Sequence, residues 1–401
     1  MSQKNDQPSQ HDFPANDYST DDIEVLSITE ACRKRPGMHL QPAPGENVYH
    51  KLLETMLGHM VTHNVMHGNL ARTIVTLRED NSAIIEDFGT GYEIIDATED
   101  APRHFVAYGN EAHQAQCAAR YPSLAISELE TQRHPTWEFS LFNALSASLT
   151  IEIRRDGNLW TQHFEKGEAL GELELEGPTE RTGTRITFTP DFELLGELDA
   201  SKGFDFETAA RDLERLAWMY PGLRLHLLEE GTMRTFEAYY PNGAMDILIK
   251  DHDIHPEQIF SLSITITPDN TRGLDLALAW RDVGALDAPA DITSMVNEVV
   301  TKGHGSHVDG IGSGIMDALL HAAQAHSIQW KIPLAERGMV AAIRIQDVDA
   351  GHHLQNNEGQ FSLASEEIES FVATAIAEHL EPWLEEHPYL VANLLERMAS
   401  H

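Results

Sequence analysis

Three histidines recur at one-turn spacing in an apolar stretch at residues 54–68. The segment ETMLGHMVTHNVMHG places His59, His63 and His67 four positions apart each time. On a helix this spacing puts the three imidazoles along one face, and imidazole nitrogen suits zinc or nickel. The sequence shows no further ligands that converge on this stripe, and histidine is abundant, with 22 in the chain. We therefore predict partly exposed histidines on an amphipathic helix and no metal site.

The charge balance limits the partners that this chain can bind directly. It carries 64 acidic and 28 basic side chains, which gives a net charge of -36. Such a charge repels nucleic acid and anionic membranes, so we expect no strong direct DNA binding. The densest basic run, RKR at 33–35, reads as a solvated turn. An acidic DNA mimic is an alternative that the charge alone suggests, although solubility explains the same charge.

Cysteine content and the polar start of the chain indicate the compartment. Cys32 and Cys117 are the only cysteines, which is too few for a disulfide framework and typical of a reducing cytosol. Residues 1–17 are polar, contain no apolar signal core and predict a disordered tail. No apolar run approaches the ~18 residues that a membrane span requires. The sequence predicts a cytoplasmic protein without membrane contact.

Hydrophobic periodicity places the histidine stripe on a helix within a mixed architecture. A strand is expected from Ile23, followed by a helical turn closed by Pro36-Gly37, and a polar connector near 241–258. The expected helices lie at 49–66, 205–219, 311–325 and from about 366. The expected strands form hairpins at Asp80-Asn81 and Asp156-Gly157, a pair at 223–240, and the runs GTRITFTPD, FSLSITITP, LDLALAW and MVAAIRIQDV. Because both halves mix helices with antiparallel strands, we predict an α+β class with two domains.

These segments, taken in order, resemble the ATPase and transducer domains of the DNA gyrase B and topoisomerase IV B family. The resemblance is carried by IEVLSITEACRKRPGMHL, EDFGTG, FNALSASLTIEIRRDG, GTRITFTPD, IHPEQIF, VNEVVTKGHGSH, GMVAAIRI and EHPYLVANLLERM. It implies a GHKL-type ATPase α/β sandwich at 18–240, followed by a transducer domain at 241–401 with a ribosomal-S5-domain-2-like fold. The family's TOPRIM domain, which holds magnesium, is expected to be absent.

The resemblance also implies roles for particular residues. Asp87 would accept the adenine amino group of ATP in the turn formed with Gly89 and Gly91. Thr184 would lie on the adenine side, and Arg155 would border the pocket. A further residue, Tyr18, matches the arm tyrosine that reaches into a partner protomer in the family. The same aspartate and glycines also suit a tight turn without any ligand.

The family's catalytic helix carries a general-base carboxylate and a magnesium asparagine, and the histidine stretch stands in its place. Counting forward from His50 puts Glu54 and Gly58 at these two positions, whereas counting back from Gly68 puts Met56 and Met60 there. Neither register supplies the asparagine, and magnesium requires hard oxygen ligands. We therefore expect ATP binding to be weak at most and magnesium binding to be absent, with Glu54 as a doubtful catalytic base.

Two further parts of the family's phosphate site are altered. No glycine occurs between Asn110 and Asp156, where the family has a glycine-rich lid whose backbone amides hold the phosphates. The transducer loop keeps Gln355 of the family's Gln-Thr-Lys run, but Asn357 or Gln360 replaces the lysine, and no lysine follows Lys331. Because phosphoryl transfer depends on positioning and charge neutralisation, losing these parts together should remove the activity.

Two main functions remain open. The first is a pseudoenzyme that has lost ATP hydrolysis and serves as a binding or regulatory protein, associating with itself or with part of a type IIA topoisomerase. The alternative is an ATP-hydrolysing clamp component that changes DNA topology together with a separate cleavage chain. Glu54, Asp87 and Thr184 favour the clamp, and the altered lid, asparagine and lysine positions oppose it.

Overall fold

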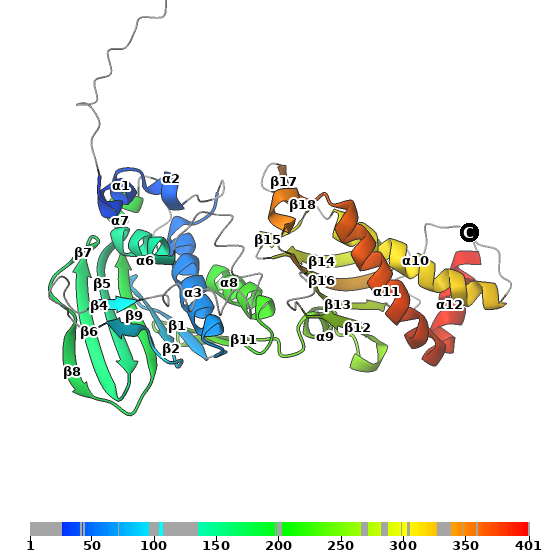
Figure 1. The fold of residues 1–401 in the computed structure, drawn as a ribbon, viewed down its shortest axis with the longest axis horizontal. Coiled ribbons are helices and arrows are strands. Elements are labelled where there is room, and N and C mark those ends of the chain that lie inside the picture. The colour runs from blue at the N-terminus through cyan, green and yellow to red at the C-terminus, as the bar shows by residue number, and fades with distance from the viewer. Residues whose placement is uncertain are drawn as a thin grey trace, which may run out of the picture.

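The computed structural model describes most of the chain between Leu26 and Ala399. The described residues are 26–40, 42, 45–70, 72–95, 104–106, 135–196, 198, 203–265, 272–281, 288–297, 299–302, 305–326, 338–347, 349–357 and 360–399. The predicted tail at 1–17, Tyr18 and the strand expected from Ile23 lie outside them. Two units stand side by side along the long axis of the molecule (Figure 1).

The first unit is built on a nine-stranded mixed sheet with the order β11-β10-β1-β2-β9-β5-β6-β7, in which β8 also pairs with β6. Its strands are β1 (Thr73–Leu77), β2 (Ala83–Asp87), β5 (Ser146–Arg155), β6 (Asn158–Glu165), β7 (Glu168–Ala169), β8 (Glu174–Pro178), β9 (Gly183–Pro190), β10 (Arg224–Glu229) and β11 (Arg234–Tyr239). A separate small hairpin joins β3 (Glu93–Ile95) to β4 (His104–Val106). The predicted hairpins at Asp80-Asn81 and Asp156-Gly157 are confirmed as β1–β2 and β5–β6.

Helices pack against this sheet, with α3 lying between α6 and α8 (Figure 1). The helices are α1 (Ile28–Lys34), α2 (Pro36–Leu40), α3 (Val48–Met66), α6 (Pro135–Ala144), α7 (Phe192–Leu195) and α8 (Phe206–Met219). Helix α3 begins where the Asn47 side chain caps the amides of Tyr49 and His50, and it ends before Gly68, whose φ of 71° breaks the helical path. The predicted helices at 49–66 and 205–219 are confirmed.

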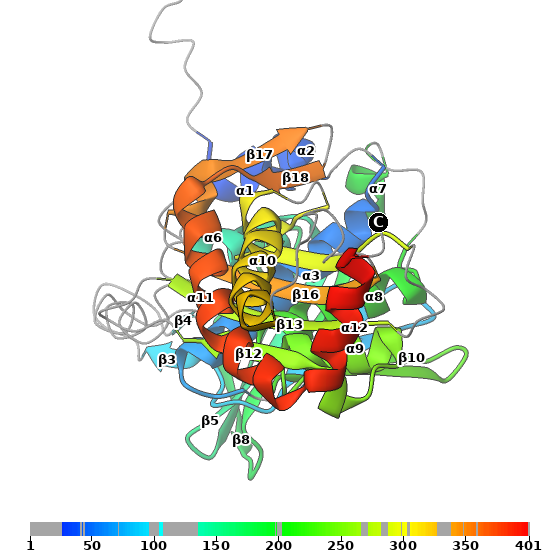
Figure 2. The ribbon, with the colours of Figure 1, turned by 90° about the vertical axis from the view of Figure 1, so that its right-hand side faces the viewer.

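The second unit is a five-stranded sheet with the order β12-β13-β16-β14-β15. Its strands are β12 (Phe260–Ile264), β13 (Arg272–Trp280), β14 (Asp291–Val296), β15 (Val299–Val300) and β16 (Met339–Asp347). Its helices are α9 (Ala244–His252), α10 (Ser306–His326), α11 (Glu366–Glu386) and α12 (Pro388–Ala399), and a hairpin joins β17 (Leu354–Asn357) to β18 (Gln360–Leu363). Helices α10 and α11 lie next to each other across the sheet (Figure 2).

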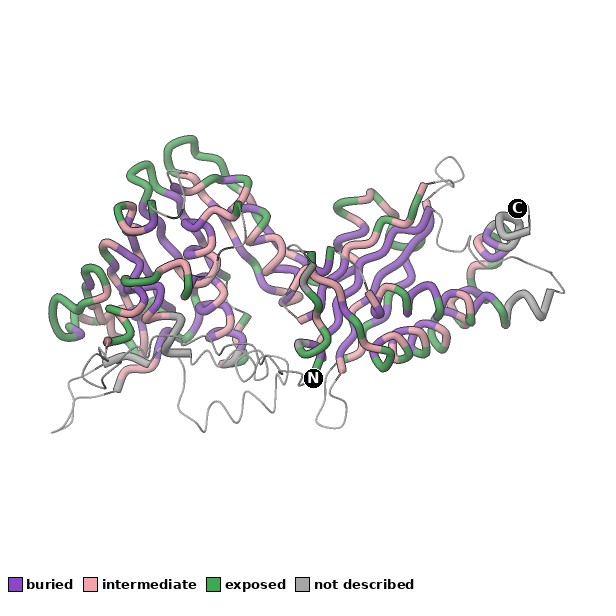
Figure 3. Tube along the Cα trace, turned by 90° about the horizontal axis from the view of Figure 1, so that it is seen from above, coloured by how far each residue is buried: buried purple, intermediate pink, exposed green. Residues whose placement is uncertain are grey.

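The second sheet uses large side chains on one face and small ones on the other. On β13, Leu276 and Leu278 belong to the core beneath α10 and α11, whereas Ala277 and Ala279 belong to the core of the first unit. Because successive side chains alternate across a strand, this pattern divides the sheet into two faces. Ile247 and Leu248 of α9 pack against the alanine side of the sheet. Buried residues, purple in Figure 3, therefore continue from the first unit into the second.

Two charged residues lie on the alanine-bearing face of the second sheet. Asp275 on β13 stands opposite Arg344 on β16. The Arg344 guanidinium donates a hydrogen bond to the carbonyl of Met219 at the end of α8, and Asp275 Oδ2 accepts one from the amide of Ala244 at the start of α9, at 3.0 Å. The Arg344–Met219 hydrogen bond therefore links the two units within their shared core.

Three local expectations are wrong. The predicted connector near 241–258 contains α9, which forms because it buries Ile247 and Leu248 and because its first amide is capped by Asp275. Pro36 was expected to close the preceding helical turn, but it is also the first residue of α2. Proline suits this position because the N–H group that it lacks would have no partner within the helix. The basic run is not merely solvated, since Arg33 donates to Asp191 at 2.7 Å and to the carbonyl of Ala144 at 2.8 Å.

Candidate functional site

Asp87 is the centre of a buried hydrogen-bond network at the end of β2. Its carboxylate accepts from the amides of Gly89 at 2.7 Å and Thr184 at 3.1 Å, and it also hydrogen-bonds to the side chain of Asn64. Thr184 Oγ1 accepts in turn from the amide of Tyr92 at 3.2 Å. Burial raises the pKa of Asp87 to about 6, although the backbone hydrogen bonds act in the opposite direction. The network keeps the end of β2 locked against β9.

Glycine is required where backbones approach each other in this network. A Cβ atom at Gly89 would lie 1.9 Å from Asn64 Oδ1. A Cβ atom at Gly183, the first residue of β9, would lie 2.0 Å from the carbonyl oxygen of Asp87, and Gly183 has a φ of +112°. Gly183 therefore excludes any side chain, independently of a ligand, whereas a side chain at Gly89 would require the Asn64 side chain to move.

The remaining predicted residues of this group hold the same turn from β5. Arg155 Nη1 donates to the carbonyl of Gly91 at 2.8 Å, and Gly91 itself has a φ of +75°. The adjacent Arg154 is buried and pairs with Glu86 at 2.6 Å. The structure thus brings together Asp87, Gly89, Gly91, Arg155 and Thr184 in one network. Besides contacts with one another and with the backbone of the turn, Asp87 hydrogen-bonds to Asn64 and Arg155 pairs with Asp156 at 3.5 Å.

Helix α3 presents thioethers toward the Asp87 network. Met56, Met60 and Asn64 follow each other at one-turn spacing, and Asn64 hydrogen-bonds to Asp87. The Met56 and Met60 side chains are both 0% exposed. Asn64 is buried as well, and sequence analysis missed it because the resemblance gave no role to its position. One and two turns before Asn64, α3 therefore carries buried thioethers, and the buried His59 and His63 lie beside them.

Glu54 lies on another face of the same helix. Two positions along a helix correspond to a rotation of about 200°, which turns Glu54 away from the face of Met56. Its carboxylate pairs with Arg215 on α8 and with Lys51 at 3.1 Å. Asp212 belongs to the same charged cluster, since Arg215 lies 3.9 Å from it. The only predicted catalytic carboxylate is thus bound in ion pairs between α3 and α8.

The prediction that the histidine stripe is partly exposed is wrong for two of its three members. His59 and His63 are 1% and 2% exposed. The ring of Tyr92 packs against both, with centroid distances of 6.0 Å to His59 and 4.6 Å to His63. His67 is half-buried, and its Nδ1 lies 2.7 Å from the carbonyl oxygen of His63. The stripe faces inward because Tyr92, which follows the Asp87 turn, covers it.

Several predicted features lie partly or wholly outside the described residues. Tyr18 and most of the altered lid belong to this group, and the structure describes the lid only from α6 onward. In the transducer loop, Gln355 on β17 and Gln360 on β18 are exposed. Within the described ranges, no group of three or more His, Cys, Asp or Glu side chains could hold a metal ion, and no helix could cross a membrane.

Comparison with known proteins shows similarity to one family. The DNA gyrase B family model matches residues 243–401. The DNA gyrase B protein of Halalkalibacterium halodurans is 24% identical over 409 residues, which cover 96% of this chain and 59% of that protein. The DNA topoisomerase 4 B protein of Streptococcus pneumoniae is 28% identical over 419 residues, which cover 97% of this chain and 59% of that protein. The chain is thus similar to the gyrase B and topoisomerase IV B proteins along nearly its whole length. It spans less than two thirds of these relatives.

Solved structures of the gyrase B family have the same fold. The 43K ATPase domain of Thermus thermophilus gyrase B, in complex with an aminocoumarin, matches with a TM-score of 0.71 at 22% identity, covering 93% of this chain and 94% of that one. The topoisomerase IV ATP-binding domain of Francisella tularensis, in complex with a small-molecule inhibitor, matches with a TM-score of 0.62 at 22% identity, covering 94% and 97%. These matches confirm the predicted α+β fold of the gyrase B ATPase region.

The charged cluster between α3 and α8 should make stability depend on pH. Burial, with a further contribution from Glu54, raises the pKa of Asp212 from 3.8 to about 7. Between these values the folded state binds the proton more tightly, so stability should fall as pH rises, by up to about 1.4 kcal/mol per pH unit from this group. In Asp212→Asn the slope between pH 4 and pH 7 should flatten, as measured by urea unfolding at each pH.

A matched control separates this cluster from the other carboxyl groups. Asp156→Asn changes an exposed carboxyl in the β5–β6 turn and should leave the slope of the parent protein unchanged. The pKa of Asp87 is also raised, but Asp87 is present in the parent and in both variants, so it contributes equally to the slope of stability against pH in all three. Equal slopes for Asp212→Asn and the parent would contradict the assignment to Asp212.

Proposed function

We propose that this chain is a non-hydrolysing member of the gyrase B and topoisomerase IV B family that acts as a binding or regulatory protein. The observation that carries the proposal is the complete burial of Met56 and Met60 on the α3 face toward Asp87. The placement of Glu54 supports the register that counts back from Gly68, in which these two methionines replace the general base and the magnesium ligand. A thioether can neither orient water as a carboxylate does nor replace an oxygen ligand of magnesium.

The residues at the phosphate end do not fit a magnesium-bound triphosphate. Met60 offers no oxygen, and no lysine is available in the β17–β18 hairpin. The chain's net charge of -36 adds no compensating attraction for an anionic ligand. Phosphoryl transfer requires this charge neutralisation, so the proposal excludes hydrolysis while leaving the protein-binding surfaces of the fold intact.

A second candidate is a clamp component that still binds ATP, and one observation favours it. Asp87 and Thr184, which the resemblance assigns to the adenine side, are joined by a hydrogen bond. However, Asp87 is 1% exposed and Thr184 is 0% exposed, and their polar groups already hydrogen-bond within the turn. The structural role of these residues in the turn is therefore enough to account for their presence. A nucleotide would have to displace packed side chains to reach them.

The partner is proposed to be a second copy of the chain or a component of a type IIA topoisomerase. The relatives are named as subunits of gyrase and topoisomerase IV. A dimer of chains that each carry a charge of -36 would be opposed by repulsion, so any self-association should tighten as salt screens the charge. A topoisomerase component with a basic surface would instead bind more weakly at high salt.

The test measures whether nucleotide affects this protein at all. We expect no ATP turnover above buffer background and no change of association state when a non-hydrolysable ATP analogue and magnesium are added. A ligand that does not distinguish two states cannot shift their populations. Turnover is measured by phosphate release, and association by sedimentation velocity at two salt concentrations.

Asp87→Asn is the control variant, checked for folding by circular dichroism. Parent and variant should behave alike in both assays. Turnover that is lost in Asp87→Asn, or a monomer-to-dimer switch that requires the analogue, would overturn the proposal and favour the ATP-dependent clamp.

A further inference from the structure

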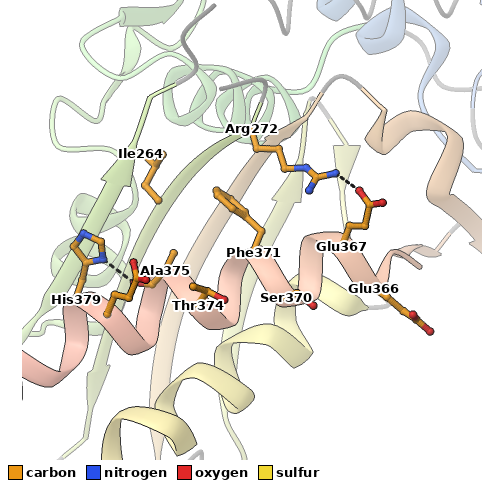
Figure 4. Close-up of a pocket in the computed structure, with 10 residues that line it drawn as sticks. Ile264, Arg272, Glu366, Glu367, Ser370, Phe371, Thr374, Ala375 and His379 are labelled. Carbon is orange, nitrogen blue, oxygen red and sulfur yellow. Dashed lines mark hydrogen bonds and ion pairs between the residues drawn. The ribbon is translucent and has the colours of Figure 1, made fainter. Parts of the chain in front are cut away.

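A groove of about 710 Å³ runs along α11 beside the edge of the second sheet, far along the chain from the Asp87 network. Its apolar part is formed by Phe371 and Ala375 of α11 and by Ile264 of β12, and all three are visible in Figure 4. Phe371 and Ile264 are partly buried and pack against the core of the second unit. The groove therefore exposes part of two large apolar side chains next to each other.

The neighbouring strand offers main-chain hydrogen-bonding groups. β12 pairs with β13 on one side, and no strand in the described part of the chain pairs with its other side. An edge strand of this kind presents backbone N–H and C=O groups that another extended segment can use. At five residues, β12 is about 17 Å long, which is the length of an ordinary strand.

Charge at the groove selects the chemistry of an occupant. Among the described residues that line it, Arg272 is the one arginine, and it is already paired with Asp347 and, at 2.6 Å, with Glu367 (Figure 4). Glu366 and Glu378 also line the groove, and both side chains are exposed. The groove thus combines an apolar floor, an open strand edge and a negative rim, and a second copy of this acidic chain is electrostatically disfavoured there.

We propose that this groove binds an extended, basic segment of a partner protein. The segment adds to β12 as a sixth strand of the second sheet. On the face of this strand that looks toward α11, apolar side chains in the middle of the segment contact Ile264 and Phe371. Lysine or arginine side chains on the same face, near the two ends of the segment, reach Glu366 and Glu378. This site specifies the kind of partner for a binding protein, but it does not rest on the loss of hydrolysis.

The probe is a fluorescein-labelled peptide of nine residues with both ends blocked. Its odd positions, which share one face of a strand, are lysine, valine, valine, valine and lysine, and its even positions are threonine. Fluorescence anisotropy with the full chain at physiological salt should show saturable binding. Phe371→Ala and Glu378→Lys should each weaken it by at least about tenfold. Glu385→Lys, an equal charge reversal on an exposed position of α11 outside the groove, should weaken it by less than about twofold.

Two control peptides test the strand geometry. A peptide of the same composition with its valines in one block, and a peptide N-methylated at alternate residues, should both bind at least about tenfold more weakly, because neither can present the required pattern. Hydrogen exchange should show protection of the amides at 260–264 when the alternating peptide is bound.

The results separate specific docking from attraction to an acidic protein. Equal affinity for the alternating and block peptides, equal affinity of Glu378→Lys and Glu385→Lys, or no saturable binding would each overturn the proposal. Because Phe371→Ala could unfold α11, its melting curve is recorded, and Glu378→Lys, which changes an exposed side chain, carries the test if that variant melts early. ATP hydrolysis by the protein would contradict the proposed function but leave this inference standing.

Discussion

Replacing Arg344 by leucine is expected to destabilise the folded protein by about 3 kcal/mol, because it removes the positive charge of a buried arginine that faces Asp275. Arg344 is 9% exposed and lies opposite Asp275 on the face of the second sheet that meets the first unit. Burial raises the pKa of Asp275, whereas Arg344 lowers it. Without Arg344 the Asp275 carboxylate would lose its compensating charge, and the Met219 carbonyl would lose its donor.

Urea unfolding of three variants tests the role of Arg344. The double variant Arg344→Leu/Asp275→Asn should recover part of the loss, since the uncompensated charge is then removed. Arg281→Leu is the matched control, because Arg281 pairs with Asp291 on the surface at 2.8 Å and should cost less than about 1 kcal/mol. If Arg344→Leu and Arg281→Leu lower the free energy of unfolding equally, the buried arginine stabilises the protein no more than a surface one.

Alanine at two helical glycines is expected to change stability in opposite directions. A Cβ atom at Gly314 of α10 would lie 2.6 Å from the carbonyl oxygen of Ala373 and 2.7 Å from Ile376 Cβ, both on α11. Gly314→Ala should therefore destabilise the protein by about 1–3 kcal/mol through overpacking. A Cβ atom at Gly58 of α3 meets nothing within 4 Å, so Gly58→Ala should stabilise by up to about 1 kcal/mol.

Chemical unfolding of the two single variants measures both effects in the same protein. Each substitution adds one methyl group to a helix interior, so they serve as controls for one another. A stabilising Gly314→Ala would mean that α10 and α11 can move apart with only a small cost in free energy. A destabilising Gly58→Ala would indicate that the space beside α3 is needed.

Periodicity predicted the elements whose neighbours are close in sequence. The β1–β2 and β5–β6 hairpins carry their own turn residues, and α3 carries its own cap at Asn47. Helix α9 was missed because its capping carboxylate, Asp275, is 31 positions away, and its cap position is Gly243, which accepts no amide with a side chain. Rules based on adjacent residues cannot detect a cap that the fold supplies from a distant strand.

The same limit applies to the candidate site. The sequence indicated that Asp87, Gly89 and Thr184 belong together, and the structure places them in one network. Spacing alone also showed that His59 and His63 share a helix face. It could not show that Tyr92 covers this face, because burial depends on a residue that reaches α3 only through the β2 turn.

The alanine-bearing face of the second sheet has a practical consequence for dividing the chain. The segment between β11 and α9 looks like a convenient place to cut, and the family match begins there, at Gly243. A fragment that ends before α9 would leave the core around Leu248 open, and a fragment that starts with α9 would leave Arg344 without Met219. The two pieces are complementary halves of one packed surface, so they should be produced together and, if separated, should be expected to reassociate.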